Sequence, residues 1–484
     1  MKLFELLENR YSTNIGDTEI TAVTDDNRKI TPGCIFICVK GEKFDGHTVA
    51  AKAIGDGAAV CICEHDLGLG DRQIVVPDSR TEYGNLCAAW FGHPERRMRF
   101  IGVTGTNGKT TITNVIKFIL TRSGHKVGLI GTIQNEIGDE VLHTDNTTPV
   151  TFELFALYQK MADAGCDTVV MEVSSFGLVQ KRIGPTHFET AVFTNLTQDH
   201  LDYHGTMENY YQAKRMLFDI CDTAIVNTDD EYGKRLFAEI TCPKYSYGKE
   251  GDFAYDSCSV RADGTQFTLH ISMDNMDTRS YRVDTRMTGF FNVANATAAL
   301  AVCTQMTGSE VSFADLLDTL GQCPGVRGRC EVIPTGREFS VICDYAHTPD
   351  AIENILENVK LYTRGRLICL FGCGGNRDKT KRPLMAQAAA KFADKLIVTS
   401  DNPRDEDPEA IIADILAGLT GTQVPYDVVT DRREAIAHAL KTAQKDDVIV
   451  LAGKGHEDYQ IFAGNVHTHF DEREVVAEEL AKLA

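Results

Sequence analysis

Short apolar runs recur along this chain, and each is followed by a polar loop and then by a helical pattern. In the first half, the expected strands lie at 100–103, 126–130, 168–171, 190–193 and 224–226. The rhythm restarts near residue 325, with expected strands at 340–343, 367–371, 395–398, 427–429 and 448–451. Strands that alternate with helices are typical of parallel sheets covered by helices on both faces. The sequence therefore predicts an α/β protein.

The length of 484 residues and the breaks in this rhythm predict three domains. Residues 1–97 are expected to form a small N-terminal β/α domain, and 98–325 a central P-loop ATPase-like domain built on a parallel sheet. Residues 326–484 are expected to form a C-terminal Rossmann-like domain. The pattern also predicts strands at 33–39 and 58–63, an antiparallel patch within 254–285, and helices at 50–54, 110–121, 292–307 and 471–482.

The charge balance excludes some classes of partner. The chain has 69 acidic and 49 basic residues, a net charge of −20. Such a surface opposes nonspecific binding to nucleic acid and docking on anionic membranes, although a local site on an acidic protein can still bind anionic small molecules. No apolar run is long enough for a membrane span, and Met1–Arg10 lacks the apolar core of a signal peptide. We expect neither nucleic-acid nor membrane partners.

The cysteines point to a reducing compartment. There are 15 of them, an odd number, and many lie in apolar runs such as Cys34–Cys38. Thiols in such runs are usually core residues, and Cys61-Ile62-Cys63 has the wrong spacing for a metal knuckle. We therefore expect a cytoplasmic protein.

The strongest single motif is Gly105-Thr106-Asn107-Gly108-Lys109-Thr110-Thr111, which follows an expected strand and precedes an expected helix. Glycines let backbone N–H groups face an anion, and the helix N-terminus adds the positive end of its dipole. In such a loop Lys109 would reach the β- and γ-phosphates of a nucleotide and the Thr110 hydroxyl would hold Mg²⁺. The strict pattern has Gly where this chain has Val103, so the loop is a variant; the alternative is a glycine-rich turn with a solvent-facing lysine.

Two further strands end in polar groups. Glu172 follows the apolar run 168–171, where a carboxylate points into the ligand crevice of a parallel sheet and suits Mg²⁺; a capping or surface acid is the alternative. The run at 190–193 leads into a loop that contains two histidines, His200 among them, and two aspartates, which favours a site. Lys214 follows on a helical pattern and by itself is typical of a helix surface.

Four polar loops follow expected strands of the last domain and should converge on one edge of the sheet. They begin at Asp344, Gly372, Ser400 and Gly453. Together they mix arginine with acidic residues, which suits a zwitterionic ligand that bears carboxylates: Arg377 and Arg404 offer bidentate recognition of carboxylate, and Glu457 suits an ammonium. Capped turns with solvent-exposed ion pairs are the alternative for any single loop.

In combination these segments resemble the Mur ligases, the ATP-dependent amide-forming enzymes of peptidoglycan assembly. The resemblance covers nearly the whole chain and rests on GTNGKTT, MEVSS, DHLDYHGTMENY, FNVANA, DYAHTPDA, GGNRDKTKRPLM, DNPRDEDP and GKGHEDYQ. It is strongest to the members that add a diamino acid to UDP-N-acetylmuramoyl-L-alanyl-D-glutamate. It implies that ATP phosphorylates the D-glutamyl carboxylate and that an amine attacks the acyl phosphate, with ATP as co-substrate and Mg²⁺ as cofactor.

The resemblance also implies roles for individual residues. Lys109, Glu172, His200 and Lys214 would be catalytic, the last as a carbamate (N6-carboxylysine), and the metal ligands would be Thr110, Glu172, His200 and Lys214. ATP contacts would be residues 105–111 together with Asn295, Arg329 and Asp344. The first domain would bind uridine, and contacts to the UDP-muramoyl peptide would be Asn27, Arg28, Gly41, His47, Thr147, Thr148, Ser174 and Arg182. Contacts to the amino acid would be Arg377, Asp401, Asn402, Arg404, Gly453 and Glu457.

In this ligase type an arginine after Asn-Pro goes with meso-2,6-diaminopimelate, so Arg404 predicts that substrate; an arginine that faces lysine would be repulsive. L-lysine or another diamino acid is the alternative within the class. Three departures from the family pattern are Phe176 in place of His, Gln198 in place of Arg, and Asp25-Asp26-Asn27-Arg28 in place of Asp-Ser-Arg.

Two more distant alternatives remain. A folylpolyglutamate synthetase would lack the first domain and the DNPR segment. A non-catalytic nucleotide-binding partner is favoured only by Phe176 and Gln198. A monomer is expected, with small molecules as its partners and domain closure assembling them.

Overall fold

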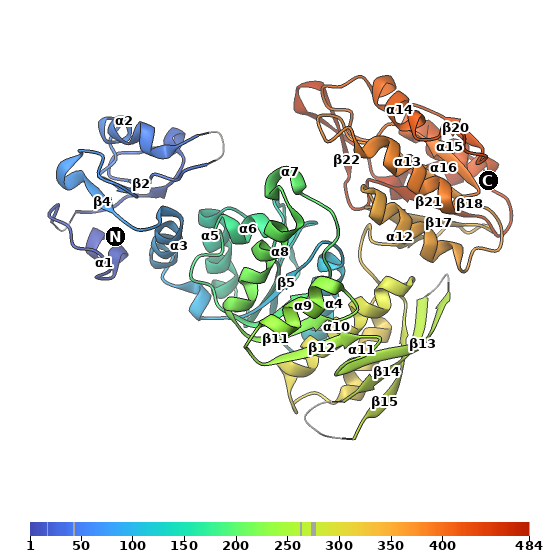
Figure 1. Ribbon diagram of the computed structural model, residues 1–484, viewed down its shortest axis with the longest axis horizontal. Coiled ribbons are helices and arrows are strands. Elements are labelled where there is room, and N and C mark those ends of the chain that lie inside the picture. The colour runs from blue at the N-terminus through green and yellow to red at the C-terminus, as the bar shows by residue number, and fades with distance from the viewer. Residues whose placement is uncertain (17, 42–43, 262–263, 273–276, 484) are drawn as a thin grey trace. The chain divides into compact units, whose positions relative to one another are not determined.

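The computed structural model describes all residues except 17, 42–43, 262–263, 273–276 and 484. The chain forms two compact units (Figure 1). Unit 1 comprises Met1–Tyr247 and Ala301–Met306, and unit 2 comprises Gly248–Leu300 and Thr307–Ala484. The domain boundaries predicted near residues 97 and 325 stay predictions.

The N-terminal part of unit 1 is built on a four-stranded parallel sheet of order β1-β2-β3-β4. The strands are β1 (Val23–Thr24), β2 (Ile35–Ile37), β3 (Val60–Cys63) and β4 (Gln73–Val75), and the helices are α1 (Leu3–Leu7), α2 (Ala50–Gly55) and α3 (Ser79–Trp90). The predicted strands near 33–39 and 58–63 and the helix at 50–54 are confirmed.

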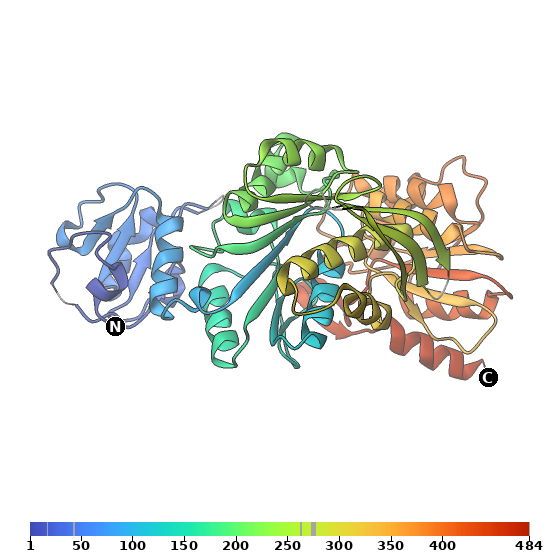
Figure 2. The ribbon, with the colours of Figure 1, turned by 90° about the horizontal axis from the view of Figure 1, so that it is seen from below.

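The remainder of unit 1 carries a parallel sheet in the order β12-β11-β10-β5-β9-β6, which the antiparallel strands β7 and β8 extend (Figures 1 and 2). The strands are β5 (Arg99–Thr104), β6 (Val127–Ile130), β7 (Asn135–Ile137), β8 (Glu140–Leu142), β9 (Thr168–Glu172), β10 (Phe188–Phe193), β11 (Cys221–Asn227) and β12 (Lys244–Gly248). The helices are α4 (Lys109–Arg122), α5 (Thr151–Asp163), α6 (Ser175–Val179), α7 (Leu201–His204), α8 (Met207–Arg215) and α9 (Glu231–Glu239). All five strands predicted in this half are present.

Unit 2 begins with the predicted antiparallel patch and a helix. The patch is β13 (Phe253–Arg261), β14 (Gly264–Ile271) and β15 (Arg279–Thr285), followed by α10 (Phe290–Thr307) and α11 (Phe313–Gln322). Residues of β14 mostly alternate between buried and half-buried, whereas every residue of β9 is buried. The difference follows from coverage, because an antiparallel sheet packed on one face alternates and a doubly covered parallel strand does not.

The rest of unit 2 is a six-stranded sheet of order β16-β17-β21-β18-β19-β20, parallel except for β16. Its strands are β16 (Glu331–Ile333), β17 (Ser340–Asp344), β18 (Leu367–Phe371), β19 (Lys395–Val398), β20 (Tyr426–Val428) and β21 (Val448–Ala452). Its helices are α12 (Pro349–Lys360), α13 (Lys381–Phe392), α14 (Pro408–Ala417), α15 (Arg432–Thr442) and α16 (Glu472–Lys482). The five predicted strands and the closing helix are confirmed.

Helices cover both faces of this sheet. Cys369 of β18 belongs to the core that holds Met385 and Ile412, and its neighbour Ile368 belongs to the core that holds Ile436. Successive strand residues point to opposite faces, so a run such as Leu367–Phe371 has to be apolar throughout. A hairpin of β22 (Tyr459–Phe462) and β23 (Val466–His469) was not predicted; its residues are half-buried or exposed, so it has no buried face to produce a strand pattern.

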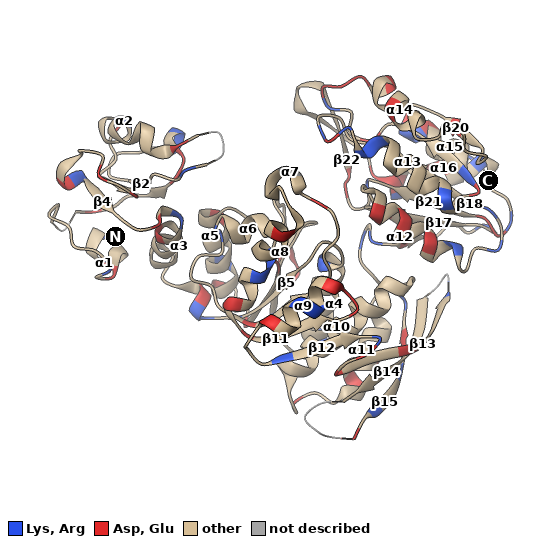
Figure 3. Cartoon of the chain, in the orientation of Figure 1, with Lys and Arg blue, Asp and Glu red and all other residues tan. Residues whose placement is uncertain are grey.

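Charged residues are spread over the elements of both units, with acidic and basic positions interspersed (Figure 3). Among the helices that the structure describes, none is both long and apolar enough to cross a membrane.

Candidate active site

The glycine-rich loop lies between β5 and α4, as its sequence context predicts. Gly105 has φ +144°, and a Cβ there would lie 1.8 Å from Thr194 Oγ1. Gly108, the N-cap of α4, has φ +89°. Both conformations require glycine, because an L side chain would clash or be strained. The loop therefore folds tightly onto the N-terminus of a 14-residue helix, a geometry suited to binding an anion.

Two lysines converge on this loop. Lys109 Nζ donates hydrogen bonds to the carbonyl oxygens of Gly105 (2.9 Å) and Thr106 (2.8 Å). Lys214 Nζ donates to the same Gly105 oxygen at 2.8 Å and lies 4.5 Å from the centre of the Tyr210 ring. The interpretation of Lys214 as a surface lysine is wrong: the residue is 1% exposed, on the face of α8 that also buries Tyr210 and Tyr211.

Burial and the neighbouring charge of Lys109 hold the pKa of Lys214 well below its ordinary value. The low-dielectric surroundings disfavour the charged form, and a second cation disfavours it further. Burial and the charge of Lys109 therefore both favour the uncharged form of the Lys214 amine. No pattern in the sequence indicated this, because the burial depends on how α8 packs against the rest of the unit.

Glu172 ends β9 and is 1% exposed, so the alternative of a surface acid is wrong. Its Oε2 accepts hydrogen bonds from the hydroxyls of Thr110 (3.1 Å) and Thr132 (3.0 Å), and its Oε1 accepts from the Thr132 backbone N–H (2.9 Å). A Cβ at Gly131 would lie 2.7 Å from Oε1, so a larger residue there would force the Glu172 carboxylate to shift. The structure thus brings Thr110 and Glu172 together at the start of α4.

The oxygen donors of Thr110 and Glu172 fit Mg²⁺, which prefers hard oxygen ligands and is often held by one or two carboxylates together with substrate phosphates. Among the described residues, no group of three or more His, Cys, Asp and Glu side chains could hold a metal by itself. A metal here would therefore depend on ligands from outside that set, which is the usual arrangement in phosphoryl-transfer sites.

His200 lies beside the loop within an aromatic cluster. Its backbone has φ +52° at the N-cap of α7. Its ring meets the ring of Phe176 edge-on at 5.2 Å and that of Tyr210 at 6.2 Å. The Tyr210 hydroxyl in turn lies 3.3 Å from Thr106 Oγ1. The Phe176 departure from the family pattern thus places an apolar ring against His200.

The residues expected to hold the muramoyl peptide group around the end of β9. Thr148 Oγ1 donates to the Glu172 carbonyl (2.9 Å) and accepts from the Ser174 backbone N–H (3.0 Å). Arg182 Nη1 donates to the Thr148 carbonyl at 2.8 Å, and the hydroxyls of Thr147 and Thr132 lie 3.0 Å apart. These contacts place the four residues within hydrogen-bonding networks that include Glu172.

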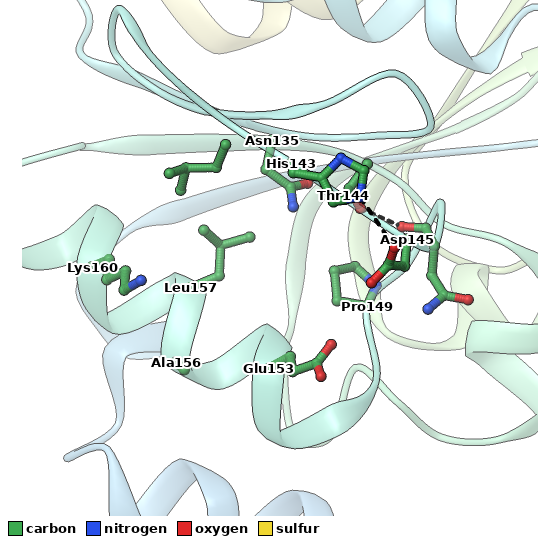
Figure 4. A pocket seen from close by; sticks show the side chains of 11 residues that line it. Asn135, His143, Thr144, Asp145, Pro149, Glu153, Ala156, Leu157 and Lys160 are labelled. Carbon is green, nitrogen blue, oxygen red and sulfur yellow. Dashed lines mark hydrogen bonds and ion pairs between the residues drawn. The ribbon is translucent and has the colours of Figure 1, made fainter. Parts of the chain in front are cut away.

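A hollow of about 360 Å³ lies beside this segment (Figure 4). Pro149, His143 and Asp145 line one side, and helix α5 lines the other. Its full lining is Asn135, Leu142–Asn146, Pro149, Glu153, Ala156, Leu157 and Lys160.

The four residues expected at the uridine occur in two loops of the N-terminal sheet. Asn27 and Arg28 lie in a short 3₁₀ turn, where the exposed Arg28 guanidinium pairs with Asp26 at 2.9 Å and lowers the pKa of that carboxyl to about 2. The Gly41 N–H donates to the Phe44 carbonyl. His47 is buried between Asp45 (2.7 Å from Nδ1) and the Glu64 N–H (3.1 Å from Nε2), so its ring is held by the fold.

Three expected nucleotide contacts lie in unit 2. Asp344 ends β17 and accepts hydrogen bonds from the backbone N–H groups of Cys330 (2.6 Å) and Ala346 (2.8 Å); burial nevertheless raises its pKa. The guanidinium of Arg329 stacks over the Tyr345 ring at 4.9 Å. Asn295, on α10, donates through Nδ2 to Asn292 Oδ1 at 3.0 Å.

The four loops of the C-terminal sheet meet, as predicted. The Gly375 N–H donates to the Asn402 carbonyl (2.9 Å), the Gly453 N–H donates to the Asp344 carbonyl (3.0 Å), and Asn402 Nδ2 donates to Glu457 Oε2 (2.9 Å). Asp401 and Asn402 are buried, whereas Arg377 is exposed.

Both the backbone and the side chain of Arg404 are fixed by hydrogen bonds. It has φ +52°, its N–H donates to the Ile461 carbonyl, and its Nη1 donates to the Gly375 carbonyl at 3.0 Å. Burial first, and then the charge of Arg377, lowers the pKa of Arg404. The charges of Arg377 and Glu457 both act on the Arg404 guanidinium, and two cations close together suit a ligand with more than one carboxylate.

Sequence reasoning missed one residue of this cluster. Lys454 follows β21 directly, is completely buried, and contacts Asn402, Asp401 and Glu457. The only signal in the sequence is its position between Gly453 and Gly455 at the end of an apolar strand.

Comparisons with known proteins identify the family. Residues 19–86 match the catalytic domain of the Mur ligase family, 103–303 match the Mur ligase middle domain, and 328–455 match the Mur ligase, glutamate ligase domain. The chain belongs to the Mur ligase family.

Two full-length relatives share one name within the Mur ligase family. A protein of Syntrophomonas wolfei subsp. wolfei is 41% identical over 99% of both chains, and one of Clostridium acetobutylicum is 42% identical over 100% of both. Both are named UDP-N-acetylmuramoyl-L-alanyl-D-glutamate--2,6-diaminopimelate ligase, the second as ligase 1. A solved structure of a ligase with that name is 32% identical to this chain and superposes on it with a TM-score of 0.72. The match covers 100% of this chain and 99% of the solved one.

Proposed function

We propose that this chain is an ATP-dependent ligase that joins meso-2,6-diaminopimelate to UDP-N-acetylmuramoyl-L-alanyl-D-glutamate, in the cytoplasm and as a monomer. The observation that carries the proposal is the cluster of Arg404, Arg377 and Glu457, which offers two cations and one anion to a ligand. The names of full-length relatives support the same reaction.

The reaction begins with transfer of a phosphoryl group. The γ-phosphoryl group of ATP passes to an oxygen of the D-glutamyl carboxylate, and ADP leaves. Lys109, which the loop carbonyls hold near Gly105, moves onto the β- and γ-phosphates, and the N-terminus of α4 stabilises their charge. Thr110 and Glu172 would hold Mg²⁺, which neutralises phosphate charge when it is bound. Asn295, Arg329 and Asp344 are proposed to hold the nucleoside.

The second step forms the amide. The uncharged amine of the amino acid attacks the acyl-phosphate carbon, the tetrahedral intermediate expels inorganic phosphate, and the nitrogen loses its proton. Catalysis depends mainly on positioning and on stabilising charge. Thr147, Thr148, Ser174 and Arg182 would orient the muramoyl peptide, and the first domain would hold uridine through residues near Asn27 and His47.

Lys214 is proposed to act as its carbamate, N6-carboxylysine, and with His200 to complete the metal site. The support is its burial together with its lowered pKa, because the uncharged amine is the form that reacts with carbon dioxide. The carbamate would bring a carboxylate to a place that now holds an amine beside Gly105.

Specificity for diaminopimelate rests on Arg404. Lysine has an ammonium where diaminopimelate has a second amino-acid centre with its carboxylate, and an ammonium beside Arg404 and Arg377 is repelled. Adding L-lysine is therefore the main competing activity.

The test is phosphate release with ATP, Mg²⁺ and UDP-N-acetylmuramoyl-L-alanyl-D-glutamate, with meso-diaminopimelate and L-lysine in parallel. We expect release with diaminopimelate only. Release with lysine alone would retain the ligase and contradict the specificity argument. Folded protein that binds ATP but releases no phosphate with any diamino acid would favour a non-catalytic nucleotide-binding protein or a ligase for another acceptor, such as a folate.

A further inference from the structure

The fully buried ammonium of Lys454 lies within hydrogen-bonding distance of three groups. Its Nζ donates to Asn402 Oδ1 at 2.5 Å and to Glu457 Oε2 at 3.0 Å, and it lies 3.3 Å from Asp401 Oδ1. Lys454 has no role in the proposed reaction steps. A lysine is almost never fully buried unless it is paired, so the contacts to Asn402, Asp401 and Glu457 are what allow Lys454 to be buried here.

Lys454 fixes the orientation of two side chains that face the proposed amino-acid ligand. Asn402 Oδ1 accepts from Lys454 and from the Ile461 N–H (3.0 Å), which leaves its Nδ2 to donate to Glu457 Oε2. Glu457 Oε2 thus accepts hydrogen bonds from both Lys454 and Asn402. The other oxygen, Oε1, lies 3.5 Å from the Tyr345 hydroxyl. One oxygen of Glu457 is locked into the protein, and the second keeps the weaker contact.

Lys454 also sets the charge of the cluster. Burial disfavours ionisation of Asp401, but the charges of Lys454 and then Arg432 outweigh it and lower the pKa of Asp401. Asp401 and Glu457 both face Lys454, and their side chains are only 11% and 13% exposed. Without Lys454, these two carboxylates would cancel the positive field of Arg404 and Arg377.

We propose that Lys454 is a positioning residue that determines specificity for the amino acid: it holds Asn402 and Glu457 in the geometry that receives the ligand's ammonium, and it preserves the positive field that receives the second carboxylate. The inference rests on the proposed function, since it concerns the same subsite. Lys454 acts through its neighbours and is not itself expected to touch the reacting atoms.

The test compares Lys454→Gln with the wild-type chain in full-length protein, by phosphate release with each substrate varied in turn. Removing a buried charge-assisted hydrogen bond should raise KM for diaminopimelate about 10- to 100-fold. KM for ATP and for the nucleotide-sugar peptide should stay within about two-fold, because only uniform binding of the amino acid is lost. The preference for diaminopimelate over L-lysine should fall about ten-fold, since the site loses a positive charge.

Lys445→Gln is the matched control, because Lys445 lies in the same part of unit 2 and pairs with Glu338 at an exposed position. It should leave all three KM values unchanged. An unchanged KM for diaminopimelate in Lys454→Gln, or an equal rise in all three KM values, would overturn the inference by showing a purely structural role.

If Lys454→Gln does not fold, the double variant Asp401→Asn with Lys454→Gln removes the buried charge imbalance and keeps hydrogen-bonding groups. A wild-type KM for diaminopimelate in that variant would also overturn the inference. Failure of the proposed function is distinguishable, because the wild-type chain itself would then release no phosphate with any diamino acid, and the inference would fall with it.

Discussion

The glycine-rich loop of unit 1 and the loop cluster of unit 2, both proposed to bind anionic ligands, are built in two different ways. Residues 105–111 are contiguous, and their shape depends on glycines with positive φ at 105 and 108. The cluster in unit 2 draws on four strand ends, and its shape depends on a buried lysine between carboxylates. A contiguous site is specified by local backbone geometry, whereas a dispersed site is specified by its charge network.

The largest expected effect breaks the contiguous site. Lys109→Met should lower the rate of phosphate release about 10³-fold, the order found when a donor to developing charge is removed. Stability should change little, because Lys109 is half-buried and its ammonium bonds to the loop carbonyls of Gly105 and Thr106. Single-turnover phosphate release and thermal unfolding measure the two effects.

Lys234→Met is the control for this substitution, since Lys234 forms an exposed pair with Glu231 on α9. Its turnover should match that of the wild-type chain. Retention of more than a tenth of the activity in Lys109→Met would show that the loop does not hold the phosphates.

The next effect tests the dispersed site. Arg404→Ala should lower kcat/KM for diaminopimelate about 100-fold, the cost of a lost bidentate charge-assisted contact, and should change kcat/KM for L-lysine by less than about three-fold. Parallel steady-state assays with the two amino acids measure the ratio. Arg433→Ala, which removes an exposed partner of Glu478, should alter neither value. An equal loss for both amino acids would assign Arg404 to loop structure, through its hydrogen bond to Gly375.

The same contrast explains which features could be predicted from the sequence and which could not. Strand periodicity predicts the mainly parallel sheets of the central and C-terminal parts of the chain, and the glycine-rich loop predicts the position of Lys109, because both signals are local. The burial of Lys214 is not predicted, since it depends on the packing of α8, and the tyrosines beside it fit a surface helix as well as a buried one. Lys454 is missed for a related reason: its partners at 401, 402 and 457 come together only when separate loops meet. The uridine residues stay predictions.

A smaller effect concerns His456, which stands beside the charge network. Burial, and then the charges of Arg329, Arg327, Arg473 and His347, lower its pKa from 6.5 to about 3. The unfolded chain takes up the proton below pH 6.5 and the folded chain does not, so stability is lost as the pH falls from 6.5 toward 3. His456→Gln should remove about 1–2 kcal/mol of the stability lost between pH 7 and pH 5. Chemical denaturation of the full chain at both values measures this.

His469 serves as the comparison, because its pKa is shifted in the opposite direction from that of His456. It is exposed, and its hydrogen bond to Glu474 raises its pKa. His469→Gln should not reduce the acid-side loss of stability. If His456→Gln leaves that loss unchanged, then His456 gains its proton in the folded state and the cationic surroundings of the loop are weaker than the structure indicates.

The smallest expected effect concerns Phe176, which lies near the contiguous site and departs from the family pattern. Phe176 packs against Tyr203 (4.3 Å between ring centres), His200 (5.2 Å) and His204 (5.7 Å). An imidazole is smaller than a phenyl ring but keeps an aromatic face toward His200, so Phe176→His should change kcat at pH 8 by less than about three-fold. Steady-state phosphate release at saturating substrates measures this. A change above about ten-fold at pH 8 would mean that position 176 touches the substrate, and the aromatic cluster would then belong to the site itself and not to its support.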